Sequence, residues 1–380
     1  MGDTAATFDC IVVGAGIAGA SVAAELAAHR RVLLVERETM PGRHSTGRSA
    51  ALFTETYGPP VIRAMSRASA SFFHTPDSPH VDHPLLRPRS VVFVARDDQM
   101  DVLSDQYVAL QPHVELMTVR EIEAEVPLLR RGHAAAGLRD ITAADIDVNA
   151  LHQHYLRSFR AAGGTLCLDA EVRAVQRKDG AWQIETKAGN FAAPVVINAA
   201  GAWADELAEL AGVRPAGLTP KRRTVLIVAG PDGMNVDDWP MVVDVEEEFY
   251  LKPDAGKLLI SPADQTPSAP CDAQPEELDI AICVDRIQNA FNLPMRRIEN
   301  KWAGLRSFLP DGDPVVGYDP QAEGFFWLAG QGGYGIQTAP AMARTASALV
   351  MHQDIPEDIA AQGVTISALA RERKGLPAQR

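Results

Sequence analysis

Three glycines near the start of the chain have the spacing of a dinucleotide-binding loop. Gly14, Gly16 and Gly19 follow one apolar run, and Glu36 ends a second apolar run. This order of strand, glycine-rich turn, helix and strand directs backbone N–H groups and the positive end of the helix at a bound pyrophosphate. A carboxylate about 20 residues beyond the glycines accepts hydrogen bonds from a ribose hydroxyl in such sites. The spacing therefore predicts a nucleotide-binding site.

Each glycine has its own expected role. Gly14 permits the tight turn, Gly16 lets the backbone approach a pyrophosphate, and Gly19 allows the helix to pack closely on the strand. A glycine-rich turn that binds nothing is the alternative for this motif taken alone. The two strands, the helix and the acid that accompany it favour nucleotide binding.

Three further segments could contact the same cofactor. The stretch 41–51 is small and hydroxyl-rich, 195–203 runs from an apolar strand into small residues, and 330–337 is a glycine loop before an alanine-rich helix that ends near Val350. The start of that helix, at 332–337, would offer N–H donors to developing negative charge. An ordinary tight turn is the alternative for each glycine loop. A nicotinamide requires one fingerprint, whereas a long cofactor that contacts four such segments indicates FAD.

The composition disfavours nucleic-acid binding. The 380 residues are 46% hydrophobic and 22% charged, which permits about two domains. The formal net charge of −13 opposes attraction to phosphates, so neither DNA nor RNA is an expected partner. The four cysteines have no metal-ligand spacing. We expect them to be reduced and mostly buried, and we expect no metal site.

The sequence contains no signal for insertion into a membrane. No stretch approaches about 20 consecutive apolar residues, and residues 1–7 are polar or small. We therefore expect no integral membrane segment and a cytoplasmic protein, with contact to a membrane surface left open.

Helix and strand patterns alternate along the chain without repeats. Acids precede an amphipathic helix expected over 147–162, in which His152 and His154 are interpreted as surface or packing residues because they are not spaced as a ligand pair. Strands are expected at 84–95, 165–168, 171–175, 182–185 and 195–198, and a β-rich stretch at 219–306 includes a hairpin that turns at 253–256.

Seven segments together resemble one group of flavoproteins. They are 44–51, 144–147, 198–203, 220–223, 249–254, 302–307 and 331–337. The chain resembles the D-amino acid oxidase and glycine oxidase type of FAD-dependent proteins over nearly its whole length. Within that type it is most similar to the bacterial D-arginine dehydrogenases, because several of the segments are specific to that subgroup.

The resemblance implies an α/β fold with an α+β second domain. A discontinuous, Rossmann-like FAD-binding domain would comprise 1–83, 143–205 and 307–380. A substrate-binding domain with a mixed β-sheet would comprise 84–142 and 206–306. Since 307–310 contains no cysteine where related sarcosine oxidases carry one, the FAD is expected to be non-covalent.

The resemblance also implies which residues contact FAD. They come from the four loops described above and from two neighbouring strands. The expected ligands are Gly14, Ala15, Gly16, Ile17, Ala18, Gly19, Glu36, Arg37, His44, Ser45, Thr46, Arg48, Ser49, Ala50, Ala51, Val172, Ala200, Gly201, Trp203, Gly332, Gly333, Tyr334, Gly335, Ile336 and Gln337.

By the same resemblance, Arg223 and Arg306 hold the carboxylate of an amino acid substrate, a task suited to the rigid donor fork of guanidinium. Tyr250 and Tyr57 would add hydroxyl contacts, with Tyr57 on a mobile lid, and the backbone of Gly333 would lie near the reacting carbon. The alternatives are a solvated basic patch for Arg223, an ion pair between domains for Arg306, and half-buried packing for the tyrosines.

The implied reaction is oxidative deamination. A hydride leaves Cα for flavin N5, and the resulting imino acid is hydrolysed to a 2-oxo acid and ammonia. A small amino acid is therefore the expected substrate partner, and either O2 or a quinone is the expected electron acceptor. An L-2-hydroxy acid or a secondary amine as substrate, a non-catalytic electron-relay subunit and a nicotinamide enzyme are the alternatives.

Two departures from the D-arginine subgroup bear on the substrate. Leu52 stands where that subgroup carries a histidine, and the stretch 89–92 contains no carboxylate to meet a cationic side chain. A buried guanidinium without a partner is costly, so we expect neutral, apolar or broad D-amino acid preference. One of the acids at 246–248 could restore the missing carboxylate, which keeps D-arginine and D-lysine open.

Overall fold

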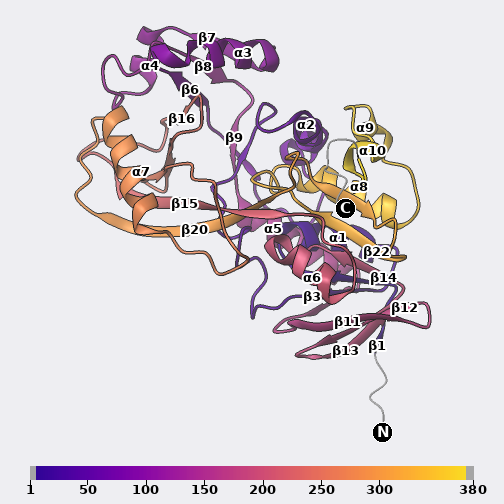
Figure 1. The fold of residues 1–380 in the computed structure, drawn as a ribbon. Helices are drawn as coiled ribbons and strands as arrows, with labels where there is room; N and C mark the ends of the chain where they lie inside the picture. Colours follow the sequence, from indigo (N-terminus) through magenta and orange to yellow (C-terminus); the bar gives the residue numbers. More distant parts are fainter. Residues whose placement is uncertain (1–5, 374–380) are drawn as a thin grey trace.

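The structure is a computed structural model that describes residues 6–373, so the ends of the predicted FAD-binding domain, 1–5 and 374–380, lie outside it. The described residues form four sheets, of which a six-stranded and a nine-stranded sheet are the largest. In Figure 1 the long strands β15 (Thr219–Ala229) and β20 (Ile298–Phe308) of the larger sheet extend towards the helices that cover the smaller one. The mixed α/β architecture agrees with the predicted fold class.

The four central strands of the six-stranded sheet are short, buried apolar runs. Across the sheet its strands are β10 (Thr165–Cys167), β3 (Val32–Val35), β2 (Cys10–Val13), β14 (Val195–Asn198), β22 (Phe325–Ala329) and β21 (Val315–Tyr318). The first five are parallel, and β21 is antiparallel to β22. Such strands are buried on both faces, which explains their continuous hydrophobic sequences.

Alternate side chains of these strands pack on opposite faces. Val12 and Leu34 contact one core, and Ile11 and Leu33 contact another. The first face is covered by α1 (Ile17–Ala27), α2 (Pro60–His74), α5 (Val148–Ala161) and α8 (Ala339–Val350). The second is covered by α6 (Ala204–Leu210) and by the sheet of β1 (Ala6–Thr7), β13 (Gly189–Ala193), β12 (Ala181–Thr186) and β11 (Val172–Lys178).

The nine-stranded sheet is mixed. In order, it contains β19 (Thr266–Pro267), β15, β18 (Lys257–Ser261), β17 (Tyr250–Asp254), β16 (Met241–Asp244), β6 (Val91–Ala95), β8 (Ala136–Asp140) and β7 (Val114–Met117), with β20 also paired to β15. Only β16 and β6 are parallel within these described pairings. Helix α7 (Glu277–Ala290), which the sequence analysis did not predict, packs on this sheet through Cys283 and Ile287.

A separate three-stranded sheet is formed by short segments of the chain. It contains β4 (Leu52–Phe53), β9 (Ala144–Ile146) and β5 (Leu86–Pro88). The single strand expected at 84–95 was therefore wrong, because the run is divided between β5 and β6. Pro88 cannot donate a backbone hydrogen bond, and the next residue, Arg89, turns its side chain to Asp145 and to the carbonyl oxygen of Asp237.

Several local predictions are confirmed. Asp147 caps α5 by accepting a hydrogen bond from the backbone of Ala150 at 2.8 Å. The hairpin of β17 and β18 turns through Ala255 and Gly256, whose φ angles of 48° and 78° suit such a turn. Of the two interpretations given for His152 and His154, packing is confirmed and surface exposure was wrong, because both are buried, at 5% and 6% exposure, within the helix packing.

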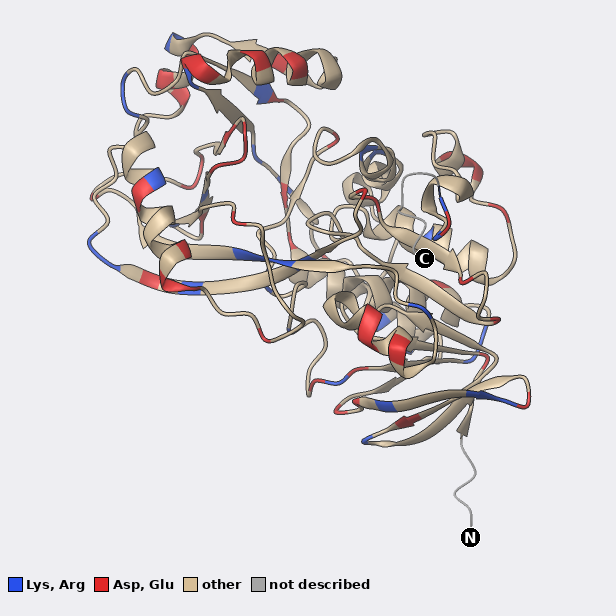
Figure 2. Cartoon of the chain, in the orientation of Figure 1, with Lys and Arg blue, Asp and Glu red and all other residues tan. Residues whose placement is uncertain are grey.

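The remaining elements extend from these sheets. They are η1 (Asp97–Gln99), α3 (Met100–Leu110), α4 (Val119–Glu125), η2 (Gly201–Trp203), α9 (Glu357–Ala360) and α10 (Ile366–Leu369). Acidic residues recur along α3 and α4 (Figure 2). Within residues 6–373, no helix is both long and apolar enough to span a bilayer. All four cysteines, which lie in this range, are free thiols.

Candidate active site

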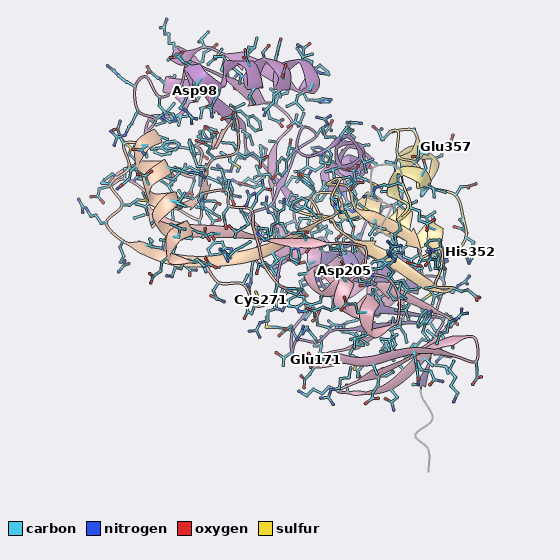
Figure 3. The ribbon with its side chains drawn as sticks, viewed as in Figure 1. Asp98, Glu171, Asp205, Cys271, His352 and Glu357 are labelled. Carbon is cyan, nitrogen blue, oxygen red and sulfur yellow. The ribbon has the colours of Figure 1, made fainter. Side chains whose placement is uncertain are left out.

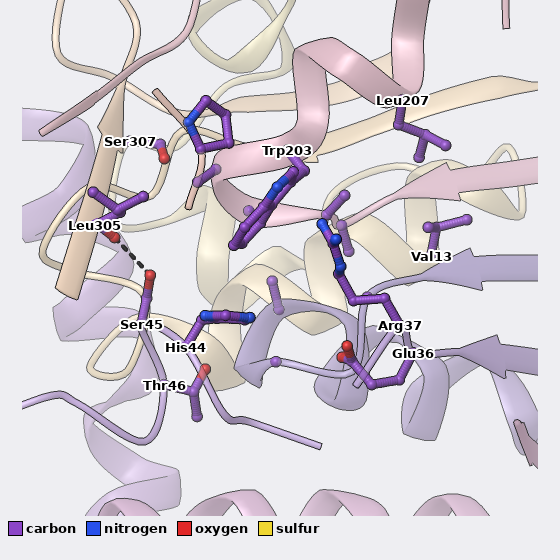
Figure 4. A pocket seen from close by; sticks show the side chains of 18 of the residues that line it. Val13, Glu36, Arg37, His44, Ser45, Thr46, Trp203, Leu207, Leu305 and Ser307 are labelled. Atoms are coloured by element: carbon purple, nitrogen blue, oxygen red, sulfur yellow. Dashed lines mark hydrogen bonds between the residues drawn. The ribbon is translucent and has the colours of Figure 1, made fainter. Parts of the chain in front are cut away.

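A cavity of 460 Å³ lies at the carboxyl ends of the parallel strands β2, β3, β14 and β22. Segments from all four predicted loops line it, including Gly14, Thr46, Gly201 and Gly332. Figure 4 shows side chains from these separate segments facing a common space, with the hydrogen bond from Ser45 to the backbone of Leu305 across one side. Open α/β sheets bind ligands at this edge because the strand ends leave a crevice there.

The first loop needs glycine at two positions for close packing. Gly14 has a φ of +101°, and a Cβ there would lie 2.5 Å from the carbonyl oxygen of Ala199. A Cβ on Gly19 would lie 1.7 Å from the carbonyl oxygen of Gly14. A Cβ on Gly16 would meet only the Thr46 hydroxyl, at 3.1 Å. The packing roles of Gly14 and Gly19 are thus explained by backbone contacts, and the approach of Gly16 to a pyrophosphate stays a prediction.

Glu36 is fixed by the loop it faces. It is 7% exposed and lines the cavity. One carboxylate oxygen accepts a hydrogen bond from the backbone N–H of Ala15 at 2.8 Å, and the other accepts one from the backbone of Glu38 at 3.0 Å. Because a carboxylate has about four acceptor positions, two remain for a ribose hydroxyl.

Three side chains form an aromatic and cationic wall in Figure 4. The rings of His44 and Trp203 lie 4.7 Å apart, and the guanidinium of Arg37 lies 5.0 Å from the Trp203 ring. Nε2 of His44 hydrogen-bonds Glu38 at 2.9 Å. Its Nδ1 is buried and has no partner within residues 6–373. An unpaired buried ring nitrogen on a cavity wall fits a site completed by a polar cofactor.

Most of the predicted FAD ligands line this cavity or one of two smaller cavities beside it. The first is lined by Gly14, Gly16, Ile17, Ala18, Glu36, Arg37, His44, Ser45, Thr46, Val172, Ala200, Gly201, Trp203, Gly332 and Gly335. The smaller ones add Arg48, Ser49, Ala50, Ala51, Gly333, Ile336 and Gln337. Ala15, Gly19 and Tyr334 line none of the three.

Arg48 and Gln337 of this set also have protein partners. Arg48 donates to the carbonyl oxygens of Ala273 at 2.9 Å and Ala303 at 2.8 Å. The side-chain amide of Gln337 donates to the Ser66 hydroxyl at 2.9 Å. Their expected contacts with the cofactor stay predictions, and in this structure both side chains hold neighbouring segments together.

The expectation that a helix begins at 332–337 was wrong. Helix α8 begins at Ala339, and the residues before it form turns. Pro340 suits the first turn of a helix because its missing N–H has no intrahelical acceptor there. Gly332 has a φ of +54°, and a Cβ on it would lie 2.2 Å from the ring of Phe308. Any backbone N–H groups that the glycine loop offers to a ligand therefore come from turns and not from the first turn of a helix.

Sequence reasoning missed residues that reach the large cavity from distant segments. Pro270 and Leu305 belong to the part of the chain that forms the nine-stranded sheet, and Glu206 and Leu210 belong to α6. Leu305 lies in the segment 302–307 that carries part of the family resemblance but was not expected at the cofactor, and the other three lie outside the segments of that resemblance. The signal that brings them here is tertiary packing.

The two smaller cavities, of 80 and 90 Å³, connect the large cavity to a group of polar residues. Ile17, Ser45 and Gly332 line both the large cavity and the 80 Å³ cavity. The 80 and 90 Å³ cavities share Arg223, Tyr250, Arg306 and Gly333. The predicted substrate residues therefore lie together, directly beside the predicted cofactor site.

Arg223 and Arg306 reach this place from paired strands. Arg223 on β15 lies opposite Gly304 on β20, so Arg306 is its diagonal neighbour on the same face. Arg223 is 6% exposed, and its Nε donates to the carbonyl oxygen of Asp264 at 2.9 Å. Burial rules out the solvated basic patch. Neither Arg223 nor Arg306 forms an ion pair within residues 6–373, so the alternative of an interdomain ion pair for Arg306 was also wrong.

The side chain of the adjacent Arg222 lies on the opposite face of β15, as expected for consecutive residues of a strand. Its guanidinium points to the other face, where it forms ion pairs with Glu276 at 2.5 Å and Asp279 at 2.9 Å. Burial by itself would lower the pKa of Arg222, but hydrogen bonds and ion pairs with these acids raise its pKa. Two neighbouring arginines on one strand thus have different environments.

Tyr57, Tyr334 and Gly333 surround the guanidinium of Arg306. Nη1 of Arg306 donates to the Tyr57 hydroxyl at 3.2 Å, and the Tyr57 ring lies 4.9 Å from that of Tyr334. Burial raises the pKa of Tyr334 above its ordinary value, which keeps this phenol neutral. A Cβ on Gly333 would lie 2.8 Å from the guanidinium of Arg306, so any larger residue there would displace the guanidinium.

Segment 268–274 connects the nine-stranded sheet to the large cavity. Pro270 lines the cavity, and Asp272 forms ion pairs with Arg43 at 3.3 Å and with Arg48. The hydrogen bond from Arg48 lowers the pKa of Asp272. Figure 3 labels Cys271, the exposed residue between them. Two arginines of the 41–51 loop therefore hold this segment at the cavity wall.

We expect Asp272→Asn to release FAD about two- to fivefold faster than the unchanged protein, the range expected for a partly exposed ion pair. The measurement is the rate of flavin fluorescence increase after dilution. Asp254→Asn, which changes an exposed acid remote from the cavity, is the matched control and should leave the rate unchanged. An unchanged rate in Asp272→Asn would show that the segment does not retain the cofactor.

Comparison with known proteins identifies the family. A model of the FAD dependent oxidoreductase family matches residues 9–349. Glycine oxidase from Geobacillus kaustophilus is 25% identical over 379 residues, covering 94% of this chain and 97% of that protein. Its crystal structure has a TM-score of 0.79 at 23% identity, covering 95% of this chain and 99% of the other.

Another relative is longer than this chain. Mitochondrial dimethylglycine dehydrogenase from Homo sapiens is 24% identical over 377 residues, which cover 92% of this chain but 43% of that protein. The family match spans both the glycine-rich loop and the two paired strands that carry Arg223 and Arg306. The chain therefore belongs to the FAD dependent oxidoreductase family, and FAD is its cofactor.

Proposed function

We propose that this chain catalyses the oxidative deamination of D-amino acids to 2-oxo acids and ammonia, as an FAD-dependent dehydrogenase. The observation that carries the proposal is a pair of arginines, the buried Arg223 and the half-buried Arg306, that have no ion-pair partner within residues 6–373 and line a small cavity beside the cofactor site. Two unpaired cations withdrawn from water are costly unless an anionic ligand completes the site. A carboxylate has the charge and the two oxygens that guanidinium forks bind.

The roles of the residues follow from this arrangement. The arginines would bind the substrate carboxylate, and the hydroxyls of Tyr57 and Tyr250 would hydrogen-bond the same end of the substrate. The nearby positive charges would disfavour the ammonium form of the substrate and so favour the neutral amine, whose lone pair supports loss of hydride from Cα. When bound, FAD supplies a two-electron acceptor for that hydride. Water then hydrolyses the imino acid.

The apolar wall of the 90 Å³ cavity favours a neutral side chain on the substrate. The wall includes Leu52, Val91, Phe93, Met241 and Val243. Arg89, from the stretch without a carboxylate, lines none of the three cavities and instead binds Asp145. These contacts support the expected preference for neutral or apolar D-amino acids.

A second candidate, a D-arginine or D-lysine dehydrogenase, is favoured by one observation. Glu247 lines the 90 Å³ cavity. Burial acts to lower the pKa of Arg306, but Tyr57, Tyr250 and, to a smaller extent, the charge of Glu247 raise it. Its neighbours are already occupied: Glu246 accepts from Gln99 at 3.0 Å, and Glu248 accepts from Arg96 at 3.0 Å. Glu247 is therefore the acid at 246–248 that could meet a cationic side chain.

Glu247→Gln separates the two candidates. If the substrate is cationic, kcat/KM for D-arginine should fall about tenfold or more relative to D-leucine, because a charged hydrogen bond is lost. If it is neutral, the ratio should stay within about twofold, since no substrate group then contacts residue 247. Glu248→Gln is the control, because that carboxylate is bound to Arg96. The ratio is measured by flavin reduction with both amino acids.

Anaerobic flavin reduction across D- and L-amino acids tests the proposal as a whole. Bleaching by D-amino acids, with one ammonia and one 2-oxo acid formed per flavin reduced, is the expected result. Bleaching by an L-2-hydroxy acid or by a secondary amine, a substrate class suggested by the name of the dimethylglycine dehydrogenase relative, would replace it. A flavin that no substrate reduces would indicate an electron-relay subunit.

We further propose non-covalent FAD and reoxidation by O2 or a quinone. No cysteine lines any of the three cavities within residues 6–373, which supports a dissociable flavin. Acid precipitation should leave the yellow colour in the supernatant.

A division into domains at the boundaries given above would place the arginine pair in one domain and the large cavity mainly in the other.

A further inference from the structure

The buried carboxylate of Asp140 lies on the wall of the substrate cavity, yet no role has been assigned to it. Asp140 ends β8 and is 1% exposed. It lines the 90 Å³ cavity together with Tyr57 and Arg306. A buried carboxylate in a substrate cavity could bind substrate, accept a proton or fix neighbouring protein groups. Its hydrogen bonds distinguish these roles.

Both oxygens of Asp140 are fully used by the protein. Oδ1 accepts from the backbone N–H and the hydroxyl of Thr142, each at 2.7 Å. Oδ2 accepts from the hydroxyls of Thr54 and Thr56. These four donors fill the acceptor positions of a carboxylate. Asp140 therefore has no free position for a substrate cation.

Two of these donors belong to the segment that carries Tyr57. Residues 54–59 form no regular secondary structure between β4 and α2. The segment is fixed by side chains: Thr54 and Thr56 bind Asp140, and the backbone N–H of Glu55 donates to the Thr142 hydroxyl at 3.3 Å. Asp140 binds Thr142 as well, so one carboxylate connects every hydroxyl of this network.

We propose that Asp140 is a positioning residue that holds the segment 54–59 over the substrate cavity and thereby places the Tyr57 hydroxyl against Arg306. Tyr57 follows Thr56 directly and accepts the hydrogen bond from Arg306 at 3.2 Å. A displacement of Thr56 would move the Tyr57 ring away from Tyr334 and Arg306. The KM measurement described below rests on the proposed function, whereas the hydrogen-exchange measurement does not.

Asp140→Asn is the test, because it keeps the side-chain volume but replaces one carboxylate oxygen with an NH2 group. That group is a donor and cannot accept the hydrogen bonds that the oxygen accepted. In the FAD-loaded protein without substrate, hydrogen exchange of a peptide covering 54–59 should become about tenfold faster, as expected for the loss of one or two hydrogen bonds. Thr56→Val, which removes one donor, should act in the same direction. Unchanged exchange in Asp140→Asn would overturn the proposal.

The kinetic measurement separates positioning from general destabilisation. KM for the best substrate of the panel should rise about tenfold in Asp140→Asn, with kcat changed less. In a Tyr57→Phe background the same substitution should have little further effect on KM, because both changes remove the same contact. Independent, multiplying effects on KM would contradict the proposal.

Asp319→Asn is the matched control. Asp319 is also buried, at 5% exposure, and its carboxylate accepts hydrogen bonds from Gln321, Trp327 and Arg371. It does not line the 90 Å³ cavity. It should lower the Tm without changing the exchange of 54–59 or KM. If no substrate reduces the flavin, the proposed function fails while the exchange measurement still decides the role of Asp140.

Discussion

Replacing Arg306 with methionine should lower kcat/KM about 100-fold or more while the Tm stays close to that of the unchanged protein. Truncating one partner of a buried, hydrogen-bonded charge pair costs about 2–5 kcal/mol of binding free energy. The Tm is spared because Arg306 has no carboxylate partner among the described residues 6–373, so its removal leaves no buried anion unpaired there. Rapid-mixing measurements of flavin reduction against substrate concentration give the first quantity, and thermal unfolding gives the second.

Arg222→Gln provides the contrast on the same strand. It also removes one positive charge, but its side chain lies on the opposite face and binds Asp279, which is itself buried. We expect the Tm to fall and KM to change little. Arg306→Lys should recover only part of the lost activity, because an ammonium cannot reproduce the two-pronged contact of guanidinium. Normal kinetics in Arg306→Met would remove this residue from the substrate site.

Gly19→Ala should prevent the cofactor domain from folding correctly. The added Cβ would lie 1.7 Å from the carbonyl oxygen of Gly14, and neither backbone can move without separating α1 from β2. Forced overpacking of a rigid backbone contact costs about 3 kcal/mol or more. The expected result is a large fall in Tm or insoluble protein, measured by thermal unfolding and by the soluble yield.

Gly16→Ala is the informative comparison for that loop. Its Cβ would meet only the Thr46 hydroxyl at 3.1 Å, and a small shift of that side chain relieves the contact. We expect a Tm of the FAD-free protein close to normal and FAD binding weakened at least about tenfold, because the glycine lets the backbone approach the pyrophosphate. Normal FAD affinity would remove Gly16 from the cofactor site, and a fall in Tm as large as that of Gly19→Ala would show that its role is packing.

Local patterns were sufficient for the first glycine-rich loop and for the strands beside it. Three features depend only on neighbours within a few residues and can therefore be predicted without knowledge of the fold. They are the glycine spacing, the apolar strands β2, β3 and β14, and the Asp147 cap. Local patterns failed where a tertiary contact decides the conformation. The run 84–95 divides at Arg89 because Asp145, from another strand, binds its guanidinium.

The sequence by itself indicated a dinucleotide cofactor, because the groups expected to bind a pyrophosphate and a ribose lie in one strand–turn–helix–strand unit, and it indicated FAD because three further small-residue loops accompany that unit. The family resemblance pointed to Arg223, but the residues at 222 and 223 do not themselves show which arginine faces the cavity, since that depends on which face of β15 packs against α7. Only the tertiary structure decided that Glu247 lines the cavity whereas Glu246 and Glu248 bind elsewhere. Side-chain direction within a run of like residues is set by packing with distant strands, and that information is absent from the run itself.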